Sequence, residues 1–326
     1  MTTMPRTPTI APGDRETIDW LLASREPAVR ALTHRELLGR RSRTDEAAIL
    51  DGPAVEALLA GQQADGGFGG HPYNKWVGAH WRLVSLVELG IPAGEPRAVA
   101  ALETVLAWIT GTGHVAGVPV IAGLARRCGS QEGNALAVAC RLGRAHDPRA
   151  AQMASALVGW QWPDGGWNCD RHPEAHRSSF NETLAPMWGL HEYATATGDT
   201  EAGDAAARAA ELFLEHRLFR ALASGERIND EWLTPHWPAY WHYESLQALV
   251  FLARMGRVTD PRAADAIDEL EARRHADGRW RGSRKWWKPP TPSGRRAAEA
   301  IDWSQDDLGD RMTTLRAMTV LRAAAA

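Results

Sequence analysis

The sequence is poor in several features that mark whole classes of protein. Three cysteines are too few, and odd in number, for a disulfide scaffold, so a reducing compartment, the cytoplasm, is expected. No run approaches about 18 apolar residues, and the longest candidate, Val115–Ala125, is predicted to be a buried helix. No apolar stretch that would mark a secretory signal follows the segment MTTMPRTPTI. A formal net charge of −3 argues against a dedicated nucleic-acid binder, whose affinity would come from neutralising phosphates.

Tryptophan is the abundant aromatic residue, with 15 copies against 4 Tyr and 5 Phe. A soluble chain with this much indole either packs it between repeated units or lines a cavity with it, and we expect both. Eleven of the tryptophans gather in four groups, which are Trp76/Trp81, Trp160/Trp162/Trp167, Trp232/Trp237/Trp241 and Trp280/Trp286/Trp287.

A short segment with a D-G step occurs three times. Gln62–Phe68 reads QQADGGF and Gln161–Trp167 reads QWPDGGW, whereas Arg274–Trp280 keeps only the D-G step and the closing aromatic residue. The copies lie roughly 100 residues apart, about twice the length of one unit of a helical repeat. Because glycine adopts positive φ without strain, a D-G step between apolar-periodic stretches predicts a turn that joins two helices.

Helical periodicity dominates elsewhere, and no convincing strand pattern is present. We predict a disordered tail over 1–14 and one all-α domain over 15–326, in which about six outer and six inner helices form a closed ring of hairpins. The outer helices are expected over 15–24, 45–61, 97–109, 148–160, 201–219 and 261–274, and the inner ones over 27–40, 75–90, 118–143, 179–197, 239–256 and 307–323.

Helix ends are also predicted from local signals. The spacing in Ser179–Glu182 and, more loosely, in Ser304–Asp307 predicts capping boxes. Helix stops are expected at Gly90, Gly143, Gly198 and Gly256. Long connections follow the D-G turns over 66–74, 165–178 and 278–303, and loops of that length in a compact domain usually carry function. In a ring of hairpins they would lie together at one rim, beside the starts of the inner helices, so that rim is the expected site.

The repeated Gln-x-x-Asp-Gly-Gly-aromatic pattern, followed by an inner helix, resembles the repeat of squalene-hopene cyclases and protein prenyltransferase β-subunits. Its Gln and aromatic residue together are similar to the QW motif of that family. By spacing, the resemblance covers nearly the whole chain, with two good copies and a third fair one. It implies an α/α toroid with a central, largely apolar cavity, although function resides in the site rather than in the fold.

The catalytic motifs of that family are not matched. Class II terpene cyclases protonate their substrate with the middle Asp of a D-x-D-D motif, and the nearest segment here, Ser304–Asp307, reads SQDD. Protein prenyltransferases bind zinc with an Asp and a Cys that follow a G-G-F-x-G-x-P loop. This chain has the loop at Gly66–Pro72, but the matching positions hold Val77 and Ala79, which cannot bind a metal. Neither motif is carried over, and no metal or other cofactor is assigned.

The segment 167–182 is the densest in reactive side chains. A metal interpretation uses Cys169, Asp170, His172 and His176, which lack the spacing of a known metal motif, and the alternative is a polar loop with internal ion pairs. Glu182 either occupies the capping box or, near aromatic surface, acts as a general acid with a raised pKa. Asp170 is a further candidate acid, and Trp167 and His176 are candidate substrate contacts.

A second segment, His236–Glu244, combines His, Trp, Tyr and Glu at the predicted start of an inner helix. On a helix Tyr240, Tyr243 and Glu244 would share one face, and Trp237 and Trp241 another. Phenol, carboxylate and imidazole groups can pass a proton, and aromatic faces stabilise a carbocation. The alternative is an amphipathic aromatic helix with hydrogen-bonded polar ends. The candidate catalytic residues are Tyr240, His242, Tyr243 and Glu244, and the candidate substrate contacts are His236, Trp237 and Trp241.

Two further groups complete the candidate site. Trp76, His80 and Trp81 lie at the start of the inner helix after the first D-G loop and are expected to face the cavity. From Arg279 to Arg296 there are seven Lys/Arg and no acid. Basic residues interleaved with Trp can hold a diphosphate, a nucleic-acid strand or an anionic membrane surface, and the alternative is a solvated loop. We favour the solvated loop, and the leading functional interpretation is a diphosphate contact made by Arg284, Lys285, Trp286 and Trp287.

These observations predict a terpenoid cyclase-like enzyme that acts on an apolar, isoprenoid-type substrate by acid-initiated cyclisation or isomerisation. A prenyl diphosphate is one such substrate, no nucleic-acid partner is expected, and peripheral membrane contact stays open. One alternative is a sugar-processing α/α barrel, in which Trp stacks on pyranose rings and two carboxylates act as acid and base. Another is a non-catalytic toroid that binds an apolar ligand or a partner.

Overall fold

In a computed structural model of the chain, residues 12–238, 240–283 and 299–326 are described. Over these residues the fold is all-α, as predicted, with one small hairpin of strands β1 (Val120–Ile121) and β2 (Leu124–Ala125). The helices in chain order are α1 (Pro12–Leu22), α2 (Pro27–Leu32), α3 (Arg43–Ala47), α4 (Pro53–Leu59), α5 (Ala79–Glu88), α6 (Pro96–Ile109), α7 (Thr112–Val115), α8 (Gly129–Arg141), α9 (Pro148–Trp160), α10 (Phe180–Thr197), α11 (Thr200–Glu215), α12 (Ser245–Arg254), α13 (Ala264–Ala272) and α14 (Leu308–Ala324). None of the helices in these ranges is both long enough and apolar enough to cross a membrane.

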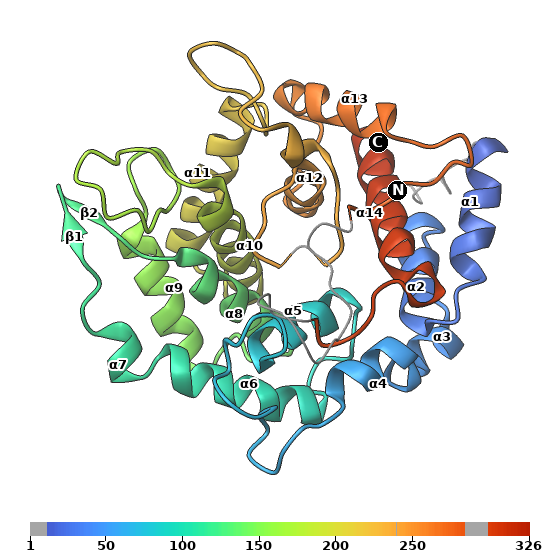
Figure 1. The fold of residues 1–326 in the computed structure, drawn as a ribbon, viewed down its shortest axis with the longest axis horizontal. Coiled ribbons are helices and arrows are strands. Elements are labelled where there is room, and N and C mark those ends of the chain that lie inside the picture. Colours follow the sequence, from blue (N-terminus) through green and yellow to red (C-terminus); the bar gives the residue numbers. More distant parts are fainter. Residues whose placement is uncertain (1–11, 239, 284–298) are drawn as a thin grey trace, which may run out of the picture.

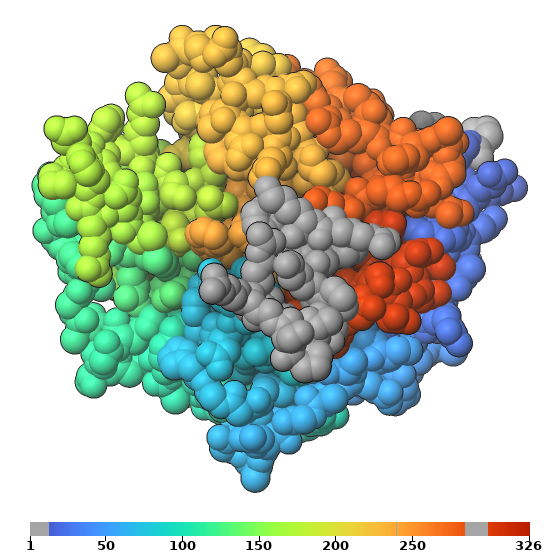
Figure 2. Space-filling model, in the orientation of Figure 1, coloured from blue at the N-terminus to red at the C-terminus, as the bar shows by residue number. Residues whose placement is uncertain are grey.

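The helices form two layers. Helices α5, α8, α10, α12 and α14 are buried on nearly every side and lie toward the centre of the molecule (Figure 1). Helices α4, α6, α9, α11 and α13 bury one face and lie outside them. Each of α5, α8, α10 and α12 contacts the outer helix that follows it in the chain. The space-filling view shows the segments following one another around the molecule in sequence order (Figure 2).

The D-G turns fasten neighbouring hairpins to each other. The Gln62 amide donates to the carbonyl of Gly66 in its own turn and to that of Arg97 in the next outer helix. Gln161 repeats this arrangement with Gly165 and with Ala205 of α11. The repeated glutamine therefore joins one hairpin to the next, which explains its spacing from the turn.

The glycines of these turns are required by both conformation and space. Gly66, Gly165 and Gly278 have φ of 86°, 93° and 78°, so the predicted positive φ is confirmed. A Cβ on Gly165 would lie 2.6 Å from the Arg208 carbonyl oxygen, and one on Gly66 would lie 2.3 Å from the Ala100 carbonyl oxygen. The turns at Gly66 and Gly165 therefore pack their backbone directly against the next outer helix. The predicted helix stops are also confirmed, with positive φ at Gly90, Gly143, Gly198 and Gly256.

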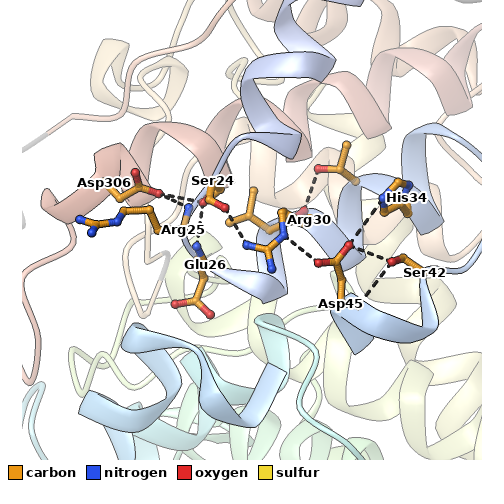
Figure 3. Close-up of polar contacts among 10 residues, drawn as sticks. Ser24, Arg25, Glu26, Arg30, His34, Ser42, Asp45 and Asp306 are labelled. Atoms are coloured by element: carbon orange, nitrogen blue, oxygen red, sulfur yellow. Dashed lines mark hydrogen bonds and ion pairs between the residues drawn. The ribbon is translucent and has the colours of Figure 1, made fainter. Parts of the chain in front are cut away.

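The first and last helical segments contact each other. The hydroxyl of Ser24 and the backbone N–H of Arg25 donate to Oδ2 of Asp306, at 2.9 and 2.8 Å (Figure 3). Thr17 donates to the carbonyl of Gly278 in the third D-G turn, and helix α14 packs on α2. The N-terminal hairpin thus fills the place beside the third turn that the following hairpin fills beside the first two.

Two predicted helices differ from the structure. Val115–Ala125 is not a buried helix, because most of it forms the β1–β2 hairpin. The turn residues Ala122 and Gly123 both have positive φ, which matches a type I′ hairpin turn and cannot continue a helix. The inner helix expected from residue 239 begins at Ser245, so Tyr240 and Tyr243 do not share a helical face.

Neither predicted capping box forms. The Ser179 side chain makes no capping hydrogen bond in the described structure, and the Glu182 carboxylate instead accepts from Ser130 at the start of α8. At Ser304–Asp307 a 3₁₀ turn precedes α14, with positive φ at Asp306 and Asp307. The Glu182 side chain is therefore directed at a neighbouring helix and not at its own.

Candidate functional site

Five aromatic side chains, which we call the aromatic cluster, gather at the N-terminal ends of the central helices. Trp76 stacks on Tyr240 with ring centroids 4.7 Å apart and an interplanar angle of 11°. Trp81 meets both rings edge-on, at 4.8 and 5.5 Å. Tyr73 and Trp241 pack against these three and complete the cluster. The structure thus brings together four residues that the sequence singled out, Trp76, Trp81, Tyr240 and Trp241.

Two loops and one helix hold the cluster together. Tyr73 and Trp76 lie in the connection after the first D-G turn, and Trp81 lies in the first turn of α5. Tyr240 and Trp241 precede α12. Tyr240 has φ of 39°, an uncommon backbone conformation for a bulky residue that recurs at ligand-binding and catalytic sites. Long connections thus meet at the starts of the inner helices, where the sequence placed the site.

Glu299 is the acidic group next to the cluster. Its carboxyl is 2% exposed, and Oε2 accepts from the hydroxyl of Tyr240 at 2.7 Å and from the indole of Trp303. Its Oε1 has no hydrogen-bond partner among the described residues. Burial raises the pKa of Glu299 to about 7, against the smaller lowering effect of its hydrogen bonds with Tyr240 and Trp303. A carboxylic acid that keeps its proton near neutral pH can donate it.

The sequence reasoning missed Glu299. The residues around it read AAEAIDW, which has no motif spacing and no concentration of reactive side chains. Its environment depends on Tyr240, which lies 59 residues earlier in the chain. The aromatic segment 236–244 gave an indirect signal for such an acid. A tyrosine hydroxyl that is buried there needs a hydrogen-bond partner.

Glu244 and Tyr243 have other partners. Both carboxylate oxygens of Glu244 accept backbone N–H groups, from Leu246 and Gln247, so this residue caps α12. Burial raises the pKa of Glu244 to about 8. The hydroxyl of Tyr243 donates to the carbonyl of Leu218, and its ring stacks on Phe213 away from the aromatic cluster. These contacts give the two residues structural roles in place of the predicted catalytic ones.

Glu182 lies on the other side of Trp241. Its Oε2 accepts from the backbone N–H and the hydroxyl of Ser130, at 3.1 and 2.7 Å. Its Oε1 accepts from the indole N–H of Trp241 at 2.8 Å, and the thiol of Cys169 is 4.0 Å from the same oxygen. Cys169 also contacts Cys128, and the hydrogen bond from the Cys128 thiol lowers the pKa of Cys169. A carboxylate, two thiols and an indole therefore converge here.

His80 is enclosed by aromatic rings. It is 2% exposed, and Tyr73, Trp81 and Trp108 surround it with centroid distances of 5.1, 4.7 and 6.1 Å. Neither ring nitrogen has a hydrogen-bond partner among the described residues. Burial lowers the pKa of His80 to about 3, so the imidazole is neutral at physiological pH.

The remaining candidates divide between core, loop and undescribed residues. Trp167 is a core residue whose indole donates to the carbonyl of Leu157. Asp170, His172 and His176 lie in an exposed loop and hydrogen-bond within it. His236 and Trp237 are buried beside the cluster, Trp237 meets Trp303 edge-on, and His242 contacts Trp76 and Trp241. Arg284, Lys285, Trp286 and Trp287 lie outside the described residues.

The SQDD segment does not supply an acid to the cluster. Asp306, at the position of the middle Asp of D-x-D-D, accepts from Ser24 and Arg25 and pairs with Arg311 at 3.5 Å. These partners hold it in the contact between the N-terminal hairpin and α14 (Figure 3). Asp306 is therefore not a member of the aromatic cluster.

Comparison with known proteins finds distant likeness among solved structures alone. No family model matches the chain, and neither does any curated protein. Among solved structures, the chain is similar to a substituted variant of the type II terpene cyclase MstE from Scytonema, in complex with its substrate geranylgeranyl dihydroxybenzoate. The identity is 15%, the match covers 83% of this chain and 95% of that chain, and the TM-score is 0.30. At that distance the likeness assigns no activity to this chain.

Proposed function

We propose that the chain is a terpenoid cyclase-like enzyme with an α/α-toroid fold. It holds an apolar, isoprenoid-type substrate against the aromatic cluster and starts cyclisation or isomerisation by proton transfer from Glu299. The contacts of the N-terminal hairpin with the third D-G turn and with Asp306 support a closed ring. The observation that carries the proposal is the buried carboxyl of Glu299 beside five aromatic rings.

Glu299 is suited to give a proton and to hold the negative charge that results. The best general acid has a pKa near the working pH, and the pKa of Glu299 is about 7. The Tyr240 hydroxyl and the Trp303 indole occupy Oε2, so the acidic proton belongs on Oε1, which has no partner among the described residues. After transfer, those two donors stabilise the carboxylate.

The aromatic cluster suits the other half of the reaction. Protonation of a carbon–carbon double bond forms a C–H bond at one carbon and leaves a carbocation at the other. The faces of Trp76, Trp81 and Tyr240 carry negative quadrupole potential, which attracts that cation without forming a bond to it. Loss of a proton to a base then restores a double bond, so the reaction needs no oxidant or reductant. Lys75, whose ammonium lies 5.4 Å from the Trp76 ring, marks the polar edge of the cluster.

The direct test uses deuterated water. Purified protein is incubated in D₂O with linear polyprenyl probes, namely squalene, geranylgeraniol and geranylgeranyl diphosphate, and the products are analysed by mass spectrometry. An acid-initiated reaction introduces one solvent deuterium into each product molecule. Glu299→Gln should lower turnover by at least about a hundredfold, because an amide cannot donate a proton of that acidity.

Two variants serve as controls. Tyr240→Phe removes the hydroxyl from Glu299 and should lower turnover, whereas Tyr243→Phe removes an equally buried hydroxyl that faces Leu218 and should leave it unchanged. Full activity of a folded Glu299→Gln variant would refute the assigned acid. Binding of a probe without any turnover by the wild-type protein would favour the non-catalytic alternative, and selective binding of oligosaccharides would favour the sugar-processing one.

A further inference from the structure

Two thiols and a carboxylate converge from three segments that are distant in the sequence. Cys128 is the residue before α8, Cys169 lies in the loop after the second D-G turn, and Glu182 is in the first turn of α10. Their ligand atoms all lie within 4.8 Å of one another. We propose that Cys128, Cys169 and Glu182 bind a zinc ion.

Glu182 is a buried carboxyl without a cationic hydrogen-bond partner among the described residues. Its side chain is 3% exposed, and within the described part of the chain its hydrogen-bond donors, Ser130, Trp241 and Cys169, are all uncharged. Buried charges in proteins are paired with opposite charges or coordinate metals. A zinc ion between Glu182 and the thiols supplies an opposite charge, and its binding displaces the two thiol protons to solvent.

The chemistry of the three ligands selects zinc among the divalent cations. Thiolate sulfur is a soft ligand that magnesium and calcium avoid, and combinations of thiolate with one harder ligand are typical of zinc. Zinc bonds of about 2.3 Å to sulfur and 2.0–2.2 Å to oxygen put tetrahedral ligand atoms roughly 3.5–3.8 Å apart. Sγ of Cys169 and Oε1 of Glu182 are 4.0 Å apart, and the three ligand atoms all lie within 4.8 Å of one another, so zinc binding needs a contraction of up to about 1 Å.

The surroundings already hold the carboxylate in position. Both donors from Ser130 bind Oε2, which fixes the carboxylate plane and leaves Oε1 on the side of Cys169. Hydrogen bonds of this kind orient the ligands of metal sites. The indole of Trp241 donates to the same Oε1 and also belongs to the aromatic cluster. The proposed ion therefore lies at the edge of the cluster.

Three protein ligands leave one position of a tetrahedral zinc ion open. In catalytic zinc sites that position takes water or an oxygen atom of the substrate. Here it would take water or the oxygen-bearing end of an otherwise apolar substrate whose chain lies on the aromatic cluster. Of the four ligands that the sequence suggested, the proposed site keeps Cys169 and does not use the exposed loop residues Asp170, His172 and His176. It is also independent of Glu299, so failure of the zinc site would leave the proposed acid untouched.

Metal analysis of the full chain tests the proposal. Protein purified without chelator is expected to contain about one zinc per chain. Chelator-treated protein titrated with CoCl₂ should show the thiolate-to-cobalt charge-transfer band in the near ultraviolet and the visible bands of tetrahedral cobalt. Cys128→Ser, Cys169→Ser and Glu182→Gln should each weaken cobalt binding by at least about tenfold. The matched control is Cys140→Ser, which changes the remaining free cysteine and should bind like the wild type.

A second measurement separates lost ligands from lost fold. Zinc added to chelator-treated protein should raise the melting temperature of the wild type and of Cys140→Ser, but not that of the ligand variants. Retention of zinc by all three ligand variants would show adventitious binding and overturn the proposal. Absence of the cobalt charge-transfer band in the wild type, or a Cys128–Cys169 disulfide in freshly purified protein, would overturn it as well.

Discussion

Replacement of Glu299 by glutamine should make the protein more stable at alkaline pH than the wild type. The Glu299→Gln change keeps the size of the side chain and mimics the neutral acid. In the folded protein burial raises the pKa of this group to about 7, from an ordinary value of 4.5. The folded state therefore holds the proton more tightly than the unfolded state does.

The sign and size of the effect follow from this difference. Below pH 4.5 the acid is neutral in both states and affects stability little. Between pH 4.5 and about 7 the folded state binds more protons, so stability falls as the pH rises. Above pH 7 the ionised folded form is disfavoured by up to about 3 kcal/mol. For a chain of this length that corresponds to about 4 °C in melting temperature.

The assay is thermal unfolding of both proteins at a series of pH values from 5 to 9. The melting temperatures should agree near pH 5, and the variant should exceed the wild type by about 4 °C at pH 8.5. The comparison isolates one group, because Glu244, with its pKa of about 8, is present in both proteins. A difference that does not change between pH 5 and 8.5 would refute the assignment of a neutral buried acid at this position.

Two further predictions concern the packing of a D-G turn and a buried ion pair. Gly165→Ala forces a Cβ to within 2.6 Å of a backbone carbonyl at φ of 93°, and should cost about 3 kcal/mol in thermal unfolding. Gly159→Ala, at an open helical position in α9, should cost nothing and gain up to about 1 kcal/mol, and equal losses from both would contradict the proposed crowding. Burial alone would raise the pKa of Glu88, but Arg254 and Arg316 lower it to about 2. Glu88→Gln should therefore destabilise the protein by about 3–5 kcal/mol at every pH from 5 to 9. The ion pairs are lost only as the pH falls from 4.5 toward about 2. A destabilisation that varied between pH 5 and 9 would contradict this interpretation.

The helices were predictable where the chain carries local signals. Glycines with positive φ end helices where the sequence placed them, and the D-G turns lie where the Gln-to-aromatic spacing predicted. The apolar run Val115–Ala125 misled the prediction because hydrophobicity alone does not distinguish a helix from a short hairpin. Gly117, Pro119 and Gly123 within it were the better signal, since they favour turns.

The aromatic cluster was predictable as a region but not residue by residue. Aromatic residues flanking the predicted inner helices indicated where aromatic side chains would gather. Pro238 made the segment before α12 look like a first helical turn, whereas the helix starts after the cap that Glu244 provides. Glu299 and the Cys128–Cys169 pair depend on contacts between segments far apart in the chain, and no local spacing encodes such contacts. The hydrogen-bond partners that distinguish the buried carboxyl of Glu299 from the helix cap Glu244 are set only once the chain has folded.

The third D-G turn differs from the first two in the order of synthesis. Its contacting helix is made long before the turn itself. The hydrogen bonds of Gln62 and Gln161 reach helices that follow within a few dozen residues. These bonds can form as soon as the next hairpin has been synthesised. The corresponding contact at Gly278 is made by Thr17 of α1, 261 positions away. Arg274 pairs with Asp14, which also lies in α1. During synthesis on the ribosome the first helix must therefore wait, without its final neighbour, until most of the polypeptide has emerged. We therefore expect the N-terminal helix to dock last when the chain folds during synthesis.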